Sequence, residues 1–141
     1  MRTIKFILML LTSFQTVAQV TEPPKELWIT DIEFERKINE KHPFGNNGNK
    51  PVLIEFWAEF NKENCFSSWN KVKDVVYYRV NIALAPETKK RYGIKMTPTL
   101  IIFKNGAKKK VWKAGLDLTI PTSLEEVQRA IDEVNAFSKR D

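Results

Sequence analysis

Apolar residues in this chain recur in short runs, and two of the runs have the pattern of strands within a sheet. Residues 52–57 are apolar except for Glu55, as expected of a central strand that is covered on both faces. Residues 75–82 are rich in β-branched and aromatic side chains, which favour strands. A shorter apolar run at residues 27–29 can form another strand.

A hairpin is predicted in the second half of the chain. Residues 99–103 and 107–112 flank the pair Asn105-Gly106, which tolerates the positive φ angles of a tight turn. The second strand is rich in lysine: Lys108, Lys109, Lys110 and Lys113. This density of charge is typical of an exposed edge strand that is protected against pairing with other chains.

Local signals predict two short helices in the first two thirds of the chain. The first begins at Thr30 or Asp31 and has apolar residues four apart on one face. The second is opened by Pro86 and ended by Gly93. Between the first helix and the first long strand, residues 41–50 are rich in Asn and Gly and predict a loop.

A capping box formed by Ser123 and Glu126 opens a longer third helix. Its apolar stripe consists of Leu124, Val127, Ile131 and Val134. The order strand, helix, strand, helix, strand, strand, helix predicts an α/β fold in which a mixed central sheet has helices on both faces.

The N-terminal residues have the build of a secretory signal. Arg2 and Lys5 supply positive charge, residues 6–14 form an apolar core, and small residues at 16–18 offer a cleavage site. The apolar run is too short to span a bilayer, and no cysteine stands at the cleavage site to carry a lipid anchor. We therefore predict a periplasmic or secreted protein without a stable membrane anchor. An uncleaved leader or an apolar N-terminal strand is the alternative.

The length of 141 residues indicates one domain. The predicted organisation is a signal peptide at 1–18, a polar leader at 19–26, a folded domain at 27–137 and a C-terminal tail at 138–141. The formal net charge of +6 is modest, and the basic residues are not interleaved with aromatic ones. This distribution argues against nucleic-acid binding.

Cysteine and histidine are each present once, which limits the chemistry that the chain can carry. Cys65 has no second cysteine with which to form an internal disulfide, so a dithiol–disulfide cycle is excluded. His42 has no second metal-binding group spaced near it, so we predict no metal site. No other cofactor is predicted.

The run that contains the first long strand resembles the active-site strand and turn of thioredoxins. It reads Val-Leu-Ile-Glu-Phe-Trp-Ala-Glu-Phe-Asn-Lys-Glu-Asn over residues 52–64, so Asn61 and Asn64 replace the two cysteines of the family's Trp-Ala-x-Trp-Cys-x-x-Cys run. Residues 90–100 resemble its Tyr-Gly-Ile-x-x-x-Pro-Thr run, and Ala114-Gly115 lies where the family usually has a glycine. The resemblance implies a thioredoxin fold, with the thioredoxin-like domain at 27–137, that lacks the dithiol.

The same resemblance implies a peptide-binding groove. The peptide bond between Thr97 and Pro98 is expected to be cis, and the backbone of Thr97 is expected to stay free to pair with an extended peptide or protein segment. The implied groove residues are Trp57, Phe60, Asn61, Asn64, Thr97 and Pro98.

Glu55 aligns with a buried acid that moves protons in many thioredoxins. Without an inner thiol to serve, it can hydrogen-bond within the core or pair with Lys62 or Arg79. If it is buried without a partner, its pKa is expected to be raised.

Cys65 directly follows the family's inner cysteine position, and two roles are open to it. Near the N-terminus of the next helix, its thiolate would be stabilised by the helix dipole. As a buried side chain, it would instead be a small inert hydrophobe. That helix is expected to be about two turns shorter than in the family, with an apolar stripe of Phe66, Trp69 and Val72.

Three functions are compatible with these features. The leading hypothesis is a redox-inactive, exported binding module that uses the groove. The alternative is a monothiol enzyme in which Cys65 forms a mixed disulfide or reduces a peroxide, with a resolving thiol borrowed from another molecule. The third is a purely structural domain with an empty groove.

Overall fold

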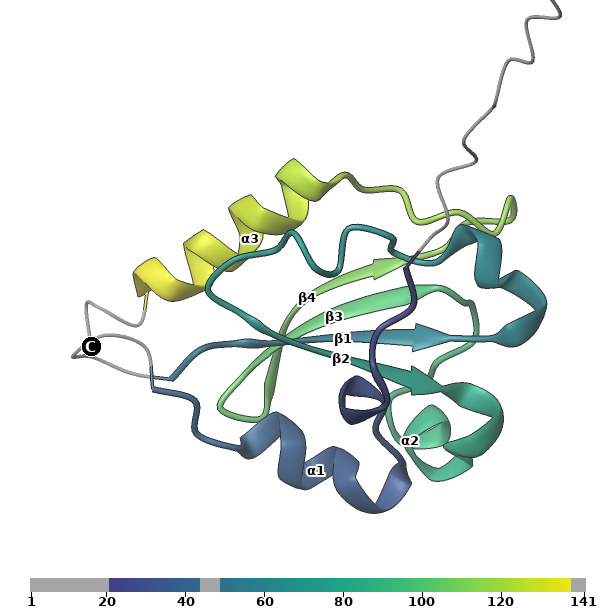
Figure 1. Ribbon diagram of the computed structural model, residues 1–141, viewed down its shortest axis with the longest axis horizontal. Coiled ribbons are helices and arrows are strands. Elements are labelled where there is room, and N and C mark those ends of the chain that lie inside the picture. The colour runs from purple at the N-terminus through teal and green to yellow at the C-terminus, as the bar shows by residue number, and fades with distance from the viewer. Residues whose placement is uncertain (1–20, 44–48, 138–141) are drawn as a thin grey trace, which may run out of the picture.

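The computed structural model describes residues 21–43 and 49–137, so the predicted signal peptide and C-terminal tail lie outside the described residues. Its centre is a four-stranded sheet (Figure 1). The strands are β1 (Val52–Trp57), β2 (Val76–Asn81), β3 (Thr99–Lys104) and β4 (Ala107–Lys113). They lie in the order β2-β1-β3-β4, and β1 is parallel to β2 but antiparallel to β3. The predicted mixed sheet is confirmed.

Helices cover both faces of this sheet. Helices α1 (Asp31–Asn39) and α2 (Pro86–Arg91) lie on one face, and α3 (Leu124–Phe137) lies on the other (Figure 1). Short 3-10 helices occur at η1 (Lys25–Leu27), η2 (Glu59–Asn64) and η3 (Ile82–Leu84). The predicted α/β fold is therefore confirmed. Among the described residues, no helix combines the length and the apolar character needed to cross a membrane.

Alternation of side chains along β1 divides the core into two layers. Val52, Ile54 and Phe56 pack in the layer that contains α1 and α2. Leu53 packs in the layer that contains the apolar stripe of α3. Glu55 follows Leu53 by two positions, so its fully buried carboxyl group lies on the α3 side of the sheet.

The predicted starts of α1 and α3 are confirmed by their hydrogen bonds. At α1, Thr30 and Glu33 form a capping box, in which the backbone N–H of Thr30 donates to the Glu33 carboxylate at 3.1 Å. At α3, the backbone N–H of Glu126 donates to Ser123 Oγ at 3.2 Å. Both signals lie within four residues of sequence, which is why they could be read in advance.

The start of α2 is capped from another helix. Its first residue is Pro86, as predicted, and its own N-cap residue provides no side-chain acceptor. Instead, the carboxylate of Asp31 accepts hydrogen bonds from the backbone N–H groups of Glu87 and Thr88, at 3.1 and 2.8 Å. The first residue of α1 therefore satisfies the free donors at the start of α2.

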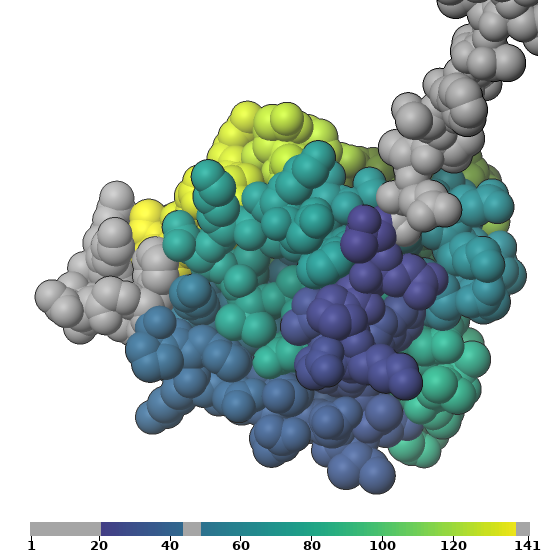
Figure 2. Space-filling model, viewed as in Figure 1, coloured from purple at the N-terminus to yellow at the C-terminus, as the bar shows by residue number. Residues whose placement is uncertain are grey.

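The two edges of the sheet differ. The turn before β4 has φ angles of 50° at Asn105 and 77° at Gly106, and β4 is the exposed edge strand that its lysines predict. Beside β2, the segment 21–29 crosses the other edge of the sheet (Figure 1), and its atoms, in purple, lie on the face of the molecule seen in Figure 2. In place of the short strand predicted there, Trp28 alone forms a bridge with Arg79, because the preceding residues are coiled in η1.

The shortened helix predicted after Asn64 does not form, and this prediction was wrong. Asn61 has non-helical backbone angles within η2, and Cys65 is extended, with φ of −62° and ψ of 161°. Residues 65–75 then run through turns and bends to β2. The apolar side chains that suggested a helix pack against the α3 layer from this irregular segment instead.

Distant side chains provide the hydrogen bonds that a helix would have made in this segment. Gln128 on α3 accepts from the backbone N–H of Lys73 at 2.8 Å and donates to its carbonyl at 3.0 Å. Asn135 Nδ2 donates to the Asp74 carbonyl at 3.1 Å. These contacts stabilise the irregular backbone because they replace the hydrogen bonds that a helix would have made.

Candidate functional site

The predicted site residues lie at one edge of the fold. The parallel strands β1 and β2 end at this edge, and the antiparallel strand β3 begins there, directly after Pro98. Since β4 is antiparallel to β3, it also ends there. We call this region the carboxyl edge; it comprises η2, η3, residues 97–98 and the loop 114–122 (Figure 1).

Asn61 is the most heavily bonded residue of the carboxyl edge. The residue is 6% exposed, and its Nδ2 donates to the Thr97 carbonyl at 2.7 Å and to the Leu118 carbonyl at 2.9 Å. Its Oδ1 accepts from Asn64 Nδ2 at 2.7 Å. The two asparagines that the resemblance aligns with the family's cysteines therefore join three segments that are distant in sequence.

Thr97 and Pro98 are both buried, and the peptide bond between them is cis. The groove prediction requires the backbone of Thr97 to be free for a peptide. Its carbonyl already accepts the hydrogen bond from Asn61, which uses one of its two lone pairs. The Thr97 side chain is also buried, and its Oγ1 has no hydrogen-bond partner among the described residues.

The two aromatic residues of the predicted groove differ in exposure. Trp57 is buried, and its ring meets the ring of Trp28 edge to face, with centroids 5.0 Å apart. The Trp57 ring therefore faces another side chain of the protein. Phe60, in η2, is 74% exposed.

Further exposed apolar side chains lie at the carboxyl edge. Leu84 in η3 is 69% exposed, and Leu116 in the loop after β4 is fully exposed. Sequence reasoning missed both, because an isolated leucine in a connection has no periodic signal. With Phe60, they give this edge an apolar character that the buried groove residues do not provide.

The loop 114–122 makes contacts that the sequence did not predict, although residues 116–122 were expected to form a longer connection than in the family. Asp117 accepts hydrogen bonds from the backbone N–H of Thr119 at 3.1 Å and from its hydroxyl at 2.7 Å. Leu118 between them has a φ of 60°, which is uncommon for a residue other than glycine, and its carbonyl faces Asn61. An Asp two residues before a Thr is a turn signal that could have identified the local turn, but not its contact with η2.

Glu55 is the centre of a buried polar cluster that includes the backbone of Phe66, just after η2. Its Oε1 accepts from Tyr77 Oη at 2.6 Å and from Arg79 Nη2 at 2.9 Å. Its Oε2 accepts from the backbone N–H of Phe66 at 2.7 Å. Of the two ionic partners predicted for Glu55, Arg79 is the one present, whereas Lys62 pairs with an exposed glutamate.

Burial raises the pKa of the Glu55 carboxyl, although the Arg79 guanidinium and the hydrogen bonds oppose this effect. Burial also raises the pKa of the Tyr77 hydroxyl well above its ordinary value, and the charge of Glu55 adds to the shift. The cluster fixes the first residues of the irregular segment, because the Phe66 N–H would otherwise be buried without an acceptor.

Cys65 is partly buried beside this cluster. Burial raises the pKa of its thiol, and the negative charge of Glu55 raises it further, while Arg79 opposes the shift. The predicted alternative of a thiolate stabilised by the next helix is wrong, since residues 65–75 form no helix. The arrangement therefore favours a protonated, weakly nucleophilic thiol at neutral pH.

Comparisons with known proteins agree on the family. The Thioredoxin family model matches residues 26–120. Thioredoxin M4 of Arabidopsis thaliana chloroplasts is 33% identical over 106 residues, a match that covers 67% of this chain and 47% of that protein. A thioredoxin of Rickettsia bellii is 33% identical over 98 residues, which cover 62% of this chain and 83% of the relative.

Solved structures show the same fold at lower identity. A Plasmodium falciparum thioredoxin has a TM-score of 0.56 at 16% identity, covering 75% of this chain and 96% of that one. A mutant thioredoxin of Halobacterium salinarum has a TM-score of 0.58 at 15% identity, covering 76% and 88%. The family match and the shared fold lead to one conclusion: this chain belongs to the thioredoxin family, with a single cysteine and without the family's Cys-x-x-Cys pair.

Proposed function

We propose that this protein is an exported member of the thioredoxin family that binds another protein and has no dithiol activity. The observation that carries the proposal is the bonding of Asn61 at a position where the family has a cysteine. An amide cannot form or exchange a disulfide. Here it is also fully engaged in holding neighbouring segments, so the position has a structural role.

The proposed binding surface is the exposed part of the carboxyl edge. It contains three apolar residues that are mostly or fully exposed, each in the segment that follows a strand: Phe60 after β1, Leu84 after β2 and Leu116 after β4. Large apolar side chains that are held on an ordered framework are the kind of anchor that protein interfaces use. Asn61 supplies such a framework by bonding η2 to the loop that carries Leu116.

The proposed partner is an exported protein that presents an apolar segment. Because the Thr97 carbonyl already accepts a hydrogen bond from Asn61, only one of its two lone pairs is left for pairing with an extended peptide. Side-chain contacts with Phe60 and Leu116 therefore supply most of the affinity in this proposal.

The test compares recovery of partners by matched variants of the mature chain. The wild-type protein and Phe137→Ala, which changes an exposed apolar residue at the far end of α3, should recover the same partner from the exported fraction of the cells. The double variant Phe60→Ala and Leu116→Ala should bind it roughly tenfold more weakly or worse. Equal affinity of all three proteins would remove the carboxyl edge from the interface.

The absence of dithiol chemistry is tested separately, with insulin and a chemical reductant. Turnover should not exceed the uncatalysed rate. Reduction that persists in Cys65→Ala would overturn the redox-inactive proposal. A partner held by a reducible mixed disulfide, and lost in Cys65→Ala, would instead favour the monothiol alternative.

Export is proposed from the leader pattern alone. N-terminal sequencing of the protein from its own cells should give a first residue at Gln19. A mature chain that retains Met1 in the cytoplasm would contradict this part of the proposal.

A further inference from the structure

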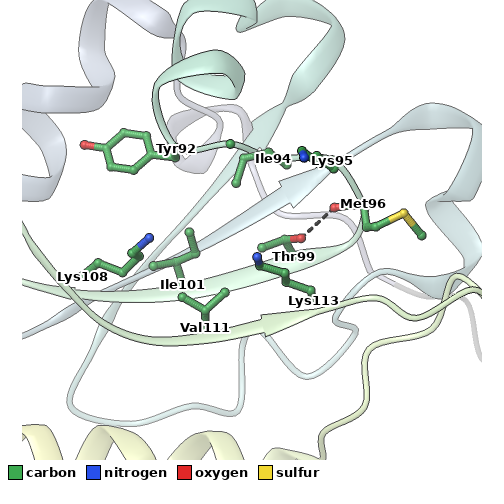
Figure 3. A pocket seen from close by; sticks show the side chains of 10 residues that line it. Tyr92, Ile94, Lys95, Met96, Thr99, Ile101, Lys108, Val111 and Lys113 are labelled. Atoms are coloured by element: carbon green, nitrogen blue, oxygen red, sulfur yellow. Dashed lines mark hydrogen bonds between the residues drawn. The ribbon is translucent and has the colours of Figure 1, made fainter.

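A cavity of about 530 Å³ lies between the connection that follows α2 and the outer half of the sheet (Figure 3). Its apolar lining comes from Ile94 in the connection, Ile101 in β3 and Val111 in β4. It shares no lining residue with the predicted groove. Small-molecule sites in proteins have volumes of roughly 300–1,000 Å³, so a compact organic molecule would fit.

Three lysines surround this apolar lining. Lys108 lies toward one end of the cavity, Lys95 and Lys113 lie toward the other, and no acidic side chain is among the lining residues (Figure 3). In the part of the chain that the structure describes, none of these lysines forms an ion pair. The cavity therefore combines an apolar floor with positive charge that the protein leaves uncompensated.

An irregularity in β4 brings Lys108 to this side of the sheet. Ile102 lies opposite Lys110, but Phe103 lies opposite Lys108, so Lys109 is an extra residue in the ladder. Such a bulge reverses the alternation of side chains beyond it. Without it, Lys109 would share the face of Val111 in place of Lys108.

Glu35 on α1, the acidic residue that Tyr92 contacts, already has its own partners. Tyr92 lines the cavity with its ring, and its hydroxyl donates to Glu35 Oε1 at 2.8 Å. The same oxygen pairs with Arg91 at 2.8 Å. Glu35 is therefore satisfied by its own partners and leaves the lysines available.

We propose that this cavity binds a small organic anion with an apolar body. The body would rest against Ile101 and Val111, and the anionic group would lie among the lysine ammonium groups. Apolar contact and charge complementarity together favour such a molecule over a neutral or cationic one of the same size. This proposal concerns a site separate from the carboxyl edge and does not depend on the function proposed for that edge.

The test uses the folded mature chain and the fluorescent probe 8-anilinonaphthalene-1-sulfonate, an aromatic anion. The wild-type protein should bind one equivalent in a saturable manner. The double variant Lys108→Ala and Lys113→Ala should bind about tenfold more weakly, since two charge contacts are removed. Val111→Phe should abolish binding by filling the cavity. Circular dichroism and cooperative thermal unfolding verify that each variant is folded.

The matched control is the double variant Lys109→Ala and Lys110→Ala, which removes the same charge from the same strand. Neither residue lines the cavity, and Lys110 lies over the ring of Trp112, 5.7 Å from its centroid, on the opposite face. This control should bind the probe as the wild type does.

Three results would overturn the proposal. The first is equal weakening in the two lysine pairs, which would assign the effect to net charge. The second is displacement of the probe by equimolar inorganic sulfate, which would remove the apolar body from recognition. The third is a lack of saturable binding to the wild-type chain. If Val111→Phe does not fold, the lysine pairs still decide the question.

Discussion

At the scale of single residues, Asn61 requires a different environment from that of a redox cysteine. A redox cysteine must be reachable by another thiol, whereas a buried amide needs partners for its donors and its acceptor. Asn61 finds them in the Thr97 carbonyl, the Leu118 carbonyl and the amide of Asn64. The position therefore contributes to stability.

Removing this amide should lower the free energy of unfolding by about 1–3 kcal/mol in Asn61→Ala, because carbonyls that are buried or partly buried lose their donor. The matched variant Asn64→Ala removes an exposed amide and should cost less than about 1 kcal/mol. Urea denaturation of both variants measures the difference. A loss in Asn61→Ala no larger than that in Asn64→Ala would show that the contacts carry little stability.

Cys65 should be alkylated slowly at neutral pH. Burial and the charge of Glu55 raise the pKa of the thiol, so the reactive thiolate is scarce until the pH exceeds the ordinary value for cysteine. Iodoacetamide labelling followed by mass spectrometry across a pH series provides the measurement. The same chain in urea is the reference and should react faster; a folded protein that reacts as fast at pH 7 would refute this expectation.

At the scale of elements, the contact between α1 and α2 makes a specific prediction for Asp31. The variant Asp31→Ala should destabilise the fold by about 1 kcal/mol, because α2 loses the acceptor for its first N–H groups. Thermal unfolding at pH 7 measures the loss. Asp31→Asn retains an acceptor oxygen and should lose less; equal losses would show that charge matters more than hydrogen bonding.

The same contact should depend on pH. Burial acts to raise the pKa of the Asp31 carboxyl, but hydrogen bonds from Thr88 and Glu87 hold it below its ordinary value of 3.8. A depressed pKa in the folded state means that the stabilisation is present above pH 3.8 and is lost as the pH falls through the folded-state pKa. The stability difference between the wild type and Asp31→Asn should therefore shrink in acid.

Elements with local signals could be predicted from the sequence, and those fixed by distant contacts could not. The Asn105-Gly106 turn and the start of α1 at Thr30 each depend on a few neighbouring residues of the chain. The irregular segment after η2 depends on Glu55, eleven residues before Phe66, and on Gln128, 55 residues after Lys73. An apolar stripe alone cannot reveal that such side chains will replace the bonds of a helix.

The candidate site was likewise predicted in part: its members could be named from the sequence, but their distant contacts could not. The resemblance identified Asn61 and Pro98 as members of one edge, and the structure brings both there. It could not indicate that Asn61 would bond the Leu118 carbonyl, since the two residues are 57 positions apart and Leu118 lies outside the quoted motifs. Exposure of Phe60 also depends on η2 and not on the motif.

At the scale of the whole molecule, the domain has one covered and one open edge. The segment that contains Trp28 covers the β2 side, and Trp69 Nε1 donates to the Thr21 carbonyl at 2.8 Å, which holds the segment in place. The β4 side is open and carries lysines. Association of copies through the sheet is therefore restricted to one edge, where like charges oppose it.

The shared donor group of Asn61 has a consequence for motion. Because one amide serves both the residues before β3 and the loop 114–122, the opening of η2 removes a partner from both. Segments linked in this way open as a cooperative unit. Their amide protons should therefore exchange with solvent deuterium at a common rate, faster than those of β1 and β3.

Hydrogen exchange read by mass spectrometry can follow this unit. Asn61→Ala should speed exchange in all three segments while β1 keeps its protection; acceleration in η2 alone would show that they move independently. If they do move together, a protein bound only at Phe60 would slow exchange around Leu118 without touching it. The side chain of Asn61 would then couple binding at η2 to the stability of the loop 114–122.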